Sequence, residues 1–180
     1  MLSRWVDVGI WLPPGTYDVK AAWVEAPYEF MGETFDGREC AAVRLLVRDE
    51  PVSVWEMALG VHDDTEQLIS GDVIGFQTDT AMGAFADACG WWALTEPFRQ
   101  FWERRGQLPG AAFDRETEKV RSGEFEKVSY SAGQADLLTI PAEEGVTPVW
   151  IGRTAAGQVA TVTVAPYLSW LAQADGHRTR

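Results

Sequence analysis

The residues best placed for chemistry are Asp79 and Asp87, which flank a Thr-Ala-Met-Gly segment in the stretch 72–87, DVIGFQTDTAMGAFAD. If this segment turns and brings the two carboxylates together, they suit a divalent cation, whose preferred ligands are carboxylate oxygens. Alternatively, one carboxyl with a raised pKa acts as an acid while the other stays ionised. The spacing lacks the acidic ligands that an EF-hand carries at loop positions one, three and five.

A structural role competes with both of these chemical roles. Asp87 stands just before Ala-Cys-Gly-Trp-Trp, where its side chain can accept backbone N–H bonds at the start of a predicted helix. We favour this interpretation. Residues 72–87 then form a junction between a strand and a helix, and the metal site of Asp79 and Asp87 is the alternative.

The chain offers little for nucleophilic catalysis. His62 and His177 are its only histidines, and no Gly-x-Ser-x-Gly elbow presents a serine. His62 with Asp63 and Asp64 fits an exposed polar loop better than a metal corner. Residues 152–158, GRTAAGQ, lack the Gly-Lys-Ser/Thr ending of a phosphate-binding loop. We therefore predict no catalytic residue and no cofactor.

The middle of the sequence is strongly acidic. No Lys or Arg lies between Arg48 and Arg99, a segment that carries ten acids: Asp49, Glu50, Glu56, Asp63, Asp64, Glu66, Asp72, Asp79, Asp87 and Glu96. The whole chain has a net charge of -12, which argues against nucleic acid or an anionic membrane as partner, because Lys and Arg carry phosphate binding. Such a surface would steer a basic protein towards it, and an ordinary solvated face is the alternative.

Length and composition predict one globular domain over residues 1–171, followed by a flexible tail over 172–180. No apolar run approaches the length of a membrane span, and the first residues lack the pattern of a secretory signal. We therefore expect a cytoplasmic protein. Cys40 and Cys89 belong to no Cys/His cluster, which indicates buried free thiols.

The elements that would position these residues are mostly strands. Period-two alternation and β-branched or aromatic enrichment predict strands at residues 5–12, 17–25, 39–48, 73–78, 136–140, 148–153 and 158–166. We expect the first two to pair in a hairpin or meander and residues 154–157 to join the last two. Residues 52–59 fit a strand or a short helix. The fold class is mainly β or α+β, an antiparallel sheet or sandwich with one or two helices.

Helix and loop predictions complete the chain. Residues 91–105 carry apolar side chains on one face of a helix, with Pro97 in its first turn; these are Trp91, Leu94, Phe98, Phe101 and Trp102. Together with Trp92 they form either core or an exposed aromatic patch, and core is the commoner outcome. Residues 27–38 and 107–112 are predicted loops, residues 60–71 a polar turn or short helix, and residues 113–128 a solvated helix.

Three segments resemble a known family when taken in order. They are Pro13-Pro14-Gly15-Thr16-Tyr17 with Val19, then Gly75 through Asp79 to Asp87, then Pro148-Val149-Trp150-Ile151-Gly152 with Gly157. This order and spacing are similar to the bacterial family known as domain of unknown function 4241, over residues 13–168. Asp18 stands where that family commonly has proline, and Thr80 and Ala81 stand where alanine and glycine are usual. The resemblance implies a β-rich bacterial intracellular domain and no particular reaction.

These observations favour a non-catalytic module that binds another protein, with the acidic region 49–96 as its face and a basic protein as its partner. An immunity- or inhibitor-like role is one specific form of this hypothesis. The alternative is a small metal-binding protein or metal-assisted hydrolase that uses Asp79 and Asp87.

Overall fold

The computed structural model describes residues 10–60, 63–68, 73–78, 81–104, 127–142 and 144–165. The chain divides into two compact units. The first unit comprises residues 1–78 and 142–180, and the second comprises residues 79–141. The prediction of a single domain over 1–171 spans both units, and the predicted tail at 172–180 lies outside the described residues.

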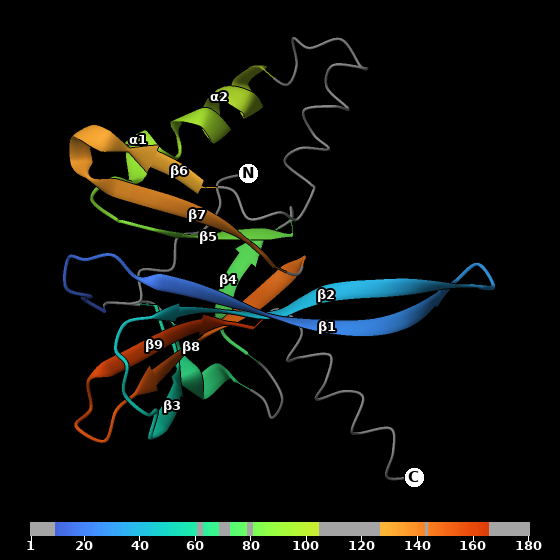
Figure 1. Ribbon diagram of the computed structural model, residues 1–180, viewed down its shortest axis with the longest axis horizontal. Coiled ribbons are helices and arrows are strands. Elements are labelled where there is room, and N and C mark those ends of the chain that lie inside the picture. Colours follow the sequence, from blue (N-terminus) through green and yellow to red (C-terminus); the bar gives the residue numbers. More distant parts are fainter. Residues whose placement is uncertain are drawn as a thin grey trace. The chain divides into compact units, whose positions relative to one another are not determined.

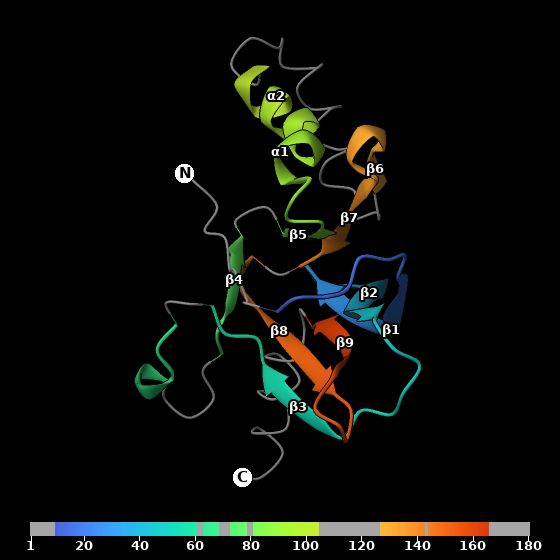
Figure 2. The ribbon, with the colours of Figure 1, turned by 90° about the vertical axis from the view of Figure 1, so that its left-hand side faces the viewer.

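The first unit is built on a six-stranded antiparallel sheet (Figure 1). Its main path runs β1 (Asp18–Phe30), β2 (Glu33–Leu46), β9 (Val159–Val164), β8 (Gly145–Arg153) and β3 (Val54–Met57). The sixth strand, β4 (Gly75–Thr78), also pairs with β8. β4 and β3 follow one another along the same edge of β8, and β9 pairs along the other edge (Figure 2).

The core of this unit lies around β9, whose sequence VATVTV alternates Val and Thr. Val43 on β2 and Val149 on β8 both pair with Val164, and Val43 and Val164 are buried. The threonines on the opposite side of β9, Thr161 and Thr163, are buried as well. The alternation of the β-branched residues Val and Thr over residues 161–164 made β9 predictable as a strand.

β1 and β2 form a long hairpin, so the loop predicted at residues 27–38 is wrong. The strands turn at Met31 and Gly32, whose φ angles of 52° and 82° are both positive, as in the two-residue turns that match the twist of a hairpin. β9 pairs with β2 only at residues 43–46. Residues 23–40 therefore continue past β9 as a two-stranded extension (Figure 1), here called the ribbon.

The second unit holds a three-stranded antiparallel sheet in the order β5 (Met82–Ala86), β7 (Ala135–Pro141) and β6 (Lys127–Tyr130). Two short helices, α1 (Trp91–Leu94) and α2 (Glu96–Arg104), follow β5. Leu94, Ala135 and Leu137 form a buried cluster, against which Ala86, Trp91 and Val128 pack. This cluster joins α1 to the sheet.

The fold class is confirmed, since the described part is mostly antiparallel β-sheet. The predicted strands at 17–25, 39–48, 73–78, 136–140, 148–153 and 158–166 all correspond to observed strands with shifted ends. Residues 52–59 contain a strand, β3, rather than a helix. The helix predicted at 91–105 is two helices, α1 and α2, with Pro97 in the first turn of α2.

Other element predictions met different outcomes. Residues 10–12 are not in a strand, and the rest of the strand predicted at 5–12 lies outside the described residues. Lys127 and Val128, predicted as the end of a helix, begin β6; residues 105–126 lie outside the described part. In the described part of the polar segment 60–71, residues Thr65–Gln67 form a short 3-10 helix, η1. Within the described ranges, no helix is long and apolar enough to cross a membrane.

Candidate functional site

The predicted turn between the two candidate aspartates is partly a strand. Met82 and Gly83 belong to β5, which ends at Ala86, directly before Asp87. A strand of this length spans about 17 Å, so Asp87 stands well away from the start of β5. Asp79 precedes β5 in the sequence and, with Asp72 and Thr80, lies outside the described residues.

The Asp87 carboxylate has a structural partner. Its Oδ1 accepts a hydrogen bond from the Cys89 backbone N–H at 2.7 Å, in an exposed loop before α1. The residue that caps α1 is Gly90, which makes no side-chain hydrogen bond. Asp87 therefore stabilises the turn that leads into the helix rather than the helix terminus itself.

The metal site of Asp79 and Asp87 stays a prediction. Among the described residues, no group of three or more His, Cys, Asp or Glu side chains could hold a metal ion. His62 and His177 also lie outside the described residues. Of the two predicted metal ligands, Asp79 and Asp87, only Asp87 lies in the described part of the chain.

The acidic segment is divided between the two units. Its members up to Asp72 belong to the first unit, while Asp79, Asp87 and Glu96 belong to the second. Asp63 accepts a bond from the Gly60 N–H at 2.6 Å, and Asp64 accepts one from the Glu66 N–H at 3.0 Å. These two carboxylates organise the loop after β3, as aspartates in turns commonly do.

Two acids of the segment have basic partners from outside it. On the first unit, Glu56 pairs with Arg153, with its Oε1 2.6 Å from Nε and 2.5 Å from Nη2. On the second, Glu96 pairs with Arg99 one helical turn later and also accepts from the Gln100 amide at 2.9 Å. The Gln100 hydrogen bond and then Arg99 hold the pKa of Glu96 below its ordinary value.

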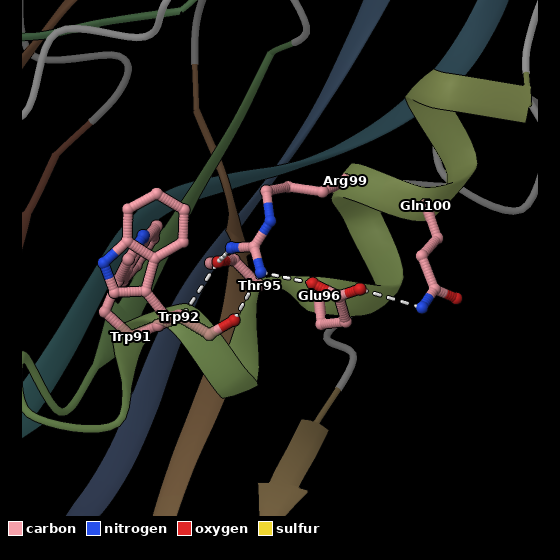
Figure 3. Close-up of polar contacts among 6 residues, drawn as sticks. All are labelled: Trp91, Trp92, Thr95, Glu96, Arg99 and Gln100. Atoms are coloured by element: carbon pink, nitrogen blue, oxygen red, sulfur yellow. Dashed lines mark hydrogen bonds and ion pairs between the residues drawn. The ribbon is translucent and has the colours of Figure 1, made fainter.

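Arg99 connects α2 to α1 (Figure 3). Its guanidinium donates to the Thr95 hydroxyl and to the Trp92 carbonyl, each at 2.7 Å, in addition to Glu96. The same group lies over the Trp92 ring at 4.6 Å from the centroid. Trp92 is nevertheless 75% exposed, whereas its neighbour Trp91 packs on the buried cluster.

The residues predicted to form either core or an aromatic patch at 91–105 therefore differ in burial. Trp91 and Leu94 belong to the core, as the commoner outcome suggested, but Trp92 is presented to solvent. The side chains of Phe98, Phe101 and Trp102 lie outside the described part of the structure.

Two regions of the first unit combine exposed apolar side chains with acids. On β3 and just after it, Val54 is 57% exposed, Trp55 44% and Leu59 39%. On the ribbon, Trp23, Val24 and Met31 are exposed as well, and Met31 reaches 90%. Val54 and Trp55 follow one another in β3, and Trp23 and Val24 follow one another in β1, so the two side chains of each pair lie on opposite faces of their strand.

The ribbon is also strongly acidic. It carries five acids, Glu25, Glu29, Glu33, Asp36 and Glu39, against the single base Arg38, for a formal charge of about -4 at neutral pH. The Arg38 guanidinium lies 4.6 Å from the centre of the Trp23 ring. This region was not predictable as a surface, because Pro27, Gly32 and Gly37 indicate a loop over residues 27–38.

The two cysteines differ, so the prediction of two buried thiols is half wrong. Cys40 is buried on β2, and this burial raises the pKa of its thiol, while Cys89 is exposed before α1. Both are free.

Two family-like motifs have structural explanations. The Tyr17 hydroxyl donates to the Pro13 carbonyl and closes the Pro-Pro-Gly turn before β1. A Cβ on Gly152 would lie 2.7 Å from the Thr161 methyl group and 2.8 Å from a Val52 methyl group, so a side chain there would disturb the packing of β8.

Comparison with protein families identifies the family of this chain. Residues 10–164 match the family described as "Protein of unknown function (DUF4241)", and the chain belongs to this family. The resemblance inferred from the three ordered motifs is therefore confirmed. Comparison with curated proteins and with solved structures gave no match.

Proposed function

We propose that this chain is a cytoplasmic, non-catalytic module that binds a basic protein through acidic and apolar side chains of its first unit. An immunity- or inhibitor-like role against such a protein is the most specific form of this proposal. The proposed face therefore lies on the first unit, where it comprises β3, which belongs to the predicted region 49–96, and the ribbon, which lies outside that region.

The observation that carries the proposal is the coincidence of charge and exposed apolar area. On β3, Val54 and Trp55 are exposed beside Glu56, although Arg153 pairs with Glu56 and the Arg44 guanidinium lies 5.6 Å from the centre of the Trp55 ring. On the ribbon, the exposed Trp23, Val24 and Met31 belong to a segment with five acids and one base. Interfaces gain affinity from aromatic anchors and gain association rate from complementary charge. A purely solvated face needs no exposed tryptophan.

Two further observations support the proposal. Three described aspartates of the acidic segment, Asp63, Asp64 and Asp87, each accept a backbone N–H bond, a role that needs no substrate. The two free cysteines suit a reducing compartment, because paired cysteines are typical of oxidising ones.

A pull-down from the source cell followed by native mass spectrometry tests this function. We expect a stoichiometric complex with a protein of high isoelectric point that dissociates as salt is raised, since screening weakens exposed charge pairs. A surface variant with Asp49→Lys and Glu50→Lys, both exposed, is expected to weaken capture. The proposal fails if no complex forms at physiological salt.

A further inference from the structure

The strand β3 stands last in the strand order of its sheet, with one edge paired to β8 (Figure 2). The Ala58 N–H donates to the Val149 carbonyl at 2.8 Å, and the register continues this ladder so that Glu56 also faces β8. Residues of an antiparallel ladder alternate between bonded and non-bonded pairs, so Trp55 and Met57 point their backbone N–H and C=O groups away from β8. Within the described part of the chain, no strand pairs with this second edge of β3, here called the outer edge.

Apolar side chains are exposed on both faces of β3. Val54 and Trp55 are both exposed, and neighbours in a strand point to opposite faces. A partner lying on one face of the sheet would therefore cover only one of these two side chains. A strand added along the outer edge would lie beside both and would also bond to the outward backbone groups. The open edge and the exposed side chains on both faces together favour addition of a strand over docking on a face.

The surplus acids lie at the two ends of β3 rather than on it. Glu56, the acid of the strand itself, is paired with Arg153. In the chain just before and after the strand, over residues 48–53 and 58–66, five acids stand against the single base Arg48; they are Asp49, Glu50, Asp63, Asp64 and Glu66. A hydrogen bond of 2.6 Å from the Gly60 N–H keeps the Asp63 carboxylate near the end of β3. The edge is therefore apolar in its middle and negative at both ends.

We infer that the outer edge of β3 is the docking site for an extended segment of the basic partner, with apolar residues in its middle and Lys or Arg at both ends. The inference rests on the proposed function and adds the place and the mode of binding. The Ile74 N–H lies 3.2 Å from the Met57 sulfur, so the chain that leads into β4 bounds one end of the edge and Trp55 is the central contact. An extended chain rises about 3.3 Å per residue, so a segment of about nine residues reaches the acids at both ends.

Charge decides between a basic partner and a second copy of this chain. Two copies joined at the outer edge as an antiparallel pair would bring the start of one β3 to the end of the other. Asp49 and Glu50 of each copy would then meet Asp63 and Asp64 of the other, and like charges in close apposition oppose association. A segment with basic ends neutralises the same carboxylates.

Fluorescence anisotropy with synthetic peptides and the full chain tests the inference. The probe is Lys-Lys-Thr-Val-Ile-Val-Thr-Lys-Lys. A matched peptide carries N-methyl groups on its Val and Ile residues, which block strand pairing along both edges of the peptide and keep every side chain and charge. We expect it to bind at least about tenfold more weakly, as the loss of about two backbone hydrogen bonds implies. Equal binding would overturn the inference, because docking through side chains alone needs no backbone N–H.

Trp55 provides a matched pair of variants. Trp55→Thr removes the ring and keeps the outward N–H, whereas Trp55→Pro removes both; proline is tolerated on an edge strand where the N–H faces away from the sheet. We expect Trp55→Pro to bind the probe at least about fivefold more weakly than Trp55→Thr, and equal affinities would contradict the inference. In the wild type, the probe should slow hydrogen exchange of the Trp55 amide measured by NMR, and unchanged exchange would also contradict it.

Charge reversal tests the ends of the edge. Asp49→Lys with Glu50→Lys, both exposed and just before β3, is expected to weaken the probe by about fivefold or more. The control, Glu33→Lys with Asp36→Lys, reverses two exposed acids of the ribbon and changes the net charge equally. We expect this control to leave binding within about twofold. Equal losses would reduce the interaction to net charge and overturn the site.

The outcomes separate this inference from the proposed function. If no basic protein is captured from the cell, the function fails. If the captured protein binds Trp55→Pro as tightly as the wild type, the function stands and the outer edge is not its site. Concentration-dependent dimerisation that Trp55→Pro abolishes would assign the outer edge to a second copy and overturn the basic partner. Melting temperatures verify that the variants are folded, and the N-methylated peptide and amide exchange, which use the wild-type chain, decide the inference if a variant unfolds.

Discussion

Two threonines of β9 provide a matched pair for testing how this sheet is stabilised. Thr161 and Thr163 lie on the same side of the strand and are both buried, with exposed fractions of 2% and 7%. The Thr161 hydroxyl donates to the Leu45 carbonyl on β2 at 2.9 Å. Among the described residues, the Thr163 hydroxyl has no hydrogen-bond partner, and neither has the indole N–H of Trp150, its cross-strand neighbour.

Valine replaces the hydroxyl of threonine by a methyl group of similar shape. Burying a hydroxyl without a partner costs about 1–3 kcal/mol, so Thr163→Val should raise the free energy of unfolding by about 1 kcal/mol. Thr161→Val removes a made hydrogen bond and should lower it by about 1 kcal/mol. Since both changes keep a β-branched residue in a central strand, strand propensity cancels between them.

Urea unfolding followed by tryptophan fluorescence measures this difference. With about 2 kcal/mol between the variants and a slope of about 2 kcal/mol/M, their midpoints should differ by about 1 M. If Thr163→Val is destabilised as much as Thr161→Val, then the Thr163 hydroxyl contributes a hydrogen bond and the account of this side of the sheet is wrong.

Three further predictions concern other parts of the molecule. Gly75→Ala places a Cβ 1.9 Å from the Thr147 carbonyl oxygen on β8, so the pairing of β4 with β8 must shift, at a cost of about 3 kcal/mol in urea unfolding; an unchanged midpoint would contradict this. Hydrogen bonds from Lys127 and then from Ser129 lower the pKa of Asp136 in the folded protein from its ordinary value of 3.8. The ionised carboxylate therefore stabilises the fold at pH values above 3.8, and this stabilisation is lost as the pH falls through the lower pKa of the folded state. Asp136→Asn should therefore flatten the acid limb of a pH–stability curve, and an identical limb would refute it. If Asp79 and Asp87 bind a metal, Ca²⁺, Mg²⁺ or Zn²⁺ should raise the melting temperature over EDTA for the wild type and not for Asp87→Asn; no shift with any ion removes the hypothesis.

The strands of the first unit were predictable because their local patterns agree with the fold. In β9, Val and Thr alternate, and in β2 the apolar Val43 and Leu45 are two residues apart. Each pattern places one kind of side chain on each face of the sheet. The turn at residues 154–157 was predictable for a similar reason, since Gly157 adopts a φ of 78° that suits glycine.

The hairpin was not predictable by the same means. Pro27, Gly32 and Gly37 each signal a loop, yet only Gly32 lies in the turn. Proline is tolerated in β1 because that strand is at the end of the sheet order, where one edge needs no donor. Whether a strand lies at the edge depends on the order of all strands in the sheet, so the sequence of residues 27–37 alone does not reveal it.

The candidate site was predicted in part. Asp87 was expected to accept backbone N–H bonds at the start of the helix. It accepts one from Cys89, which lies two residues before the first residue of α1, Trp91. The strand β5 between Asp79 and Asp87 was missed because MGAFA is short and rich in small residues. Arg99 could not be identified as the link between α1 and α2, because its partners depend on the break in the helix at Thr95.

Capture of a partner at two salt concentrations tests whether the first unit binds a basic protein. The full chain is immobilised, exposed to lysate of the source cell, and washed at about 0.1 M and about 0.5 M salt, across which the screening length falls by half or more. We expect a basic protein in stoichiometric amount at the lower salt concentration and its release at the higher one. Reversing the charge of the exposed acids Asp49 and Glu50 on the first unit is expected to abolish capture. Retention of no protein, or of an acidic protein insensitive to salt, would contradict the account.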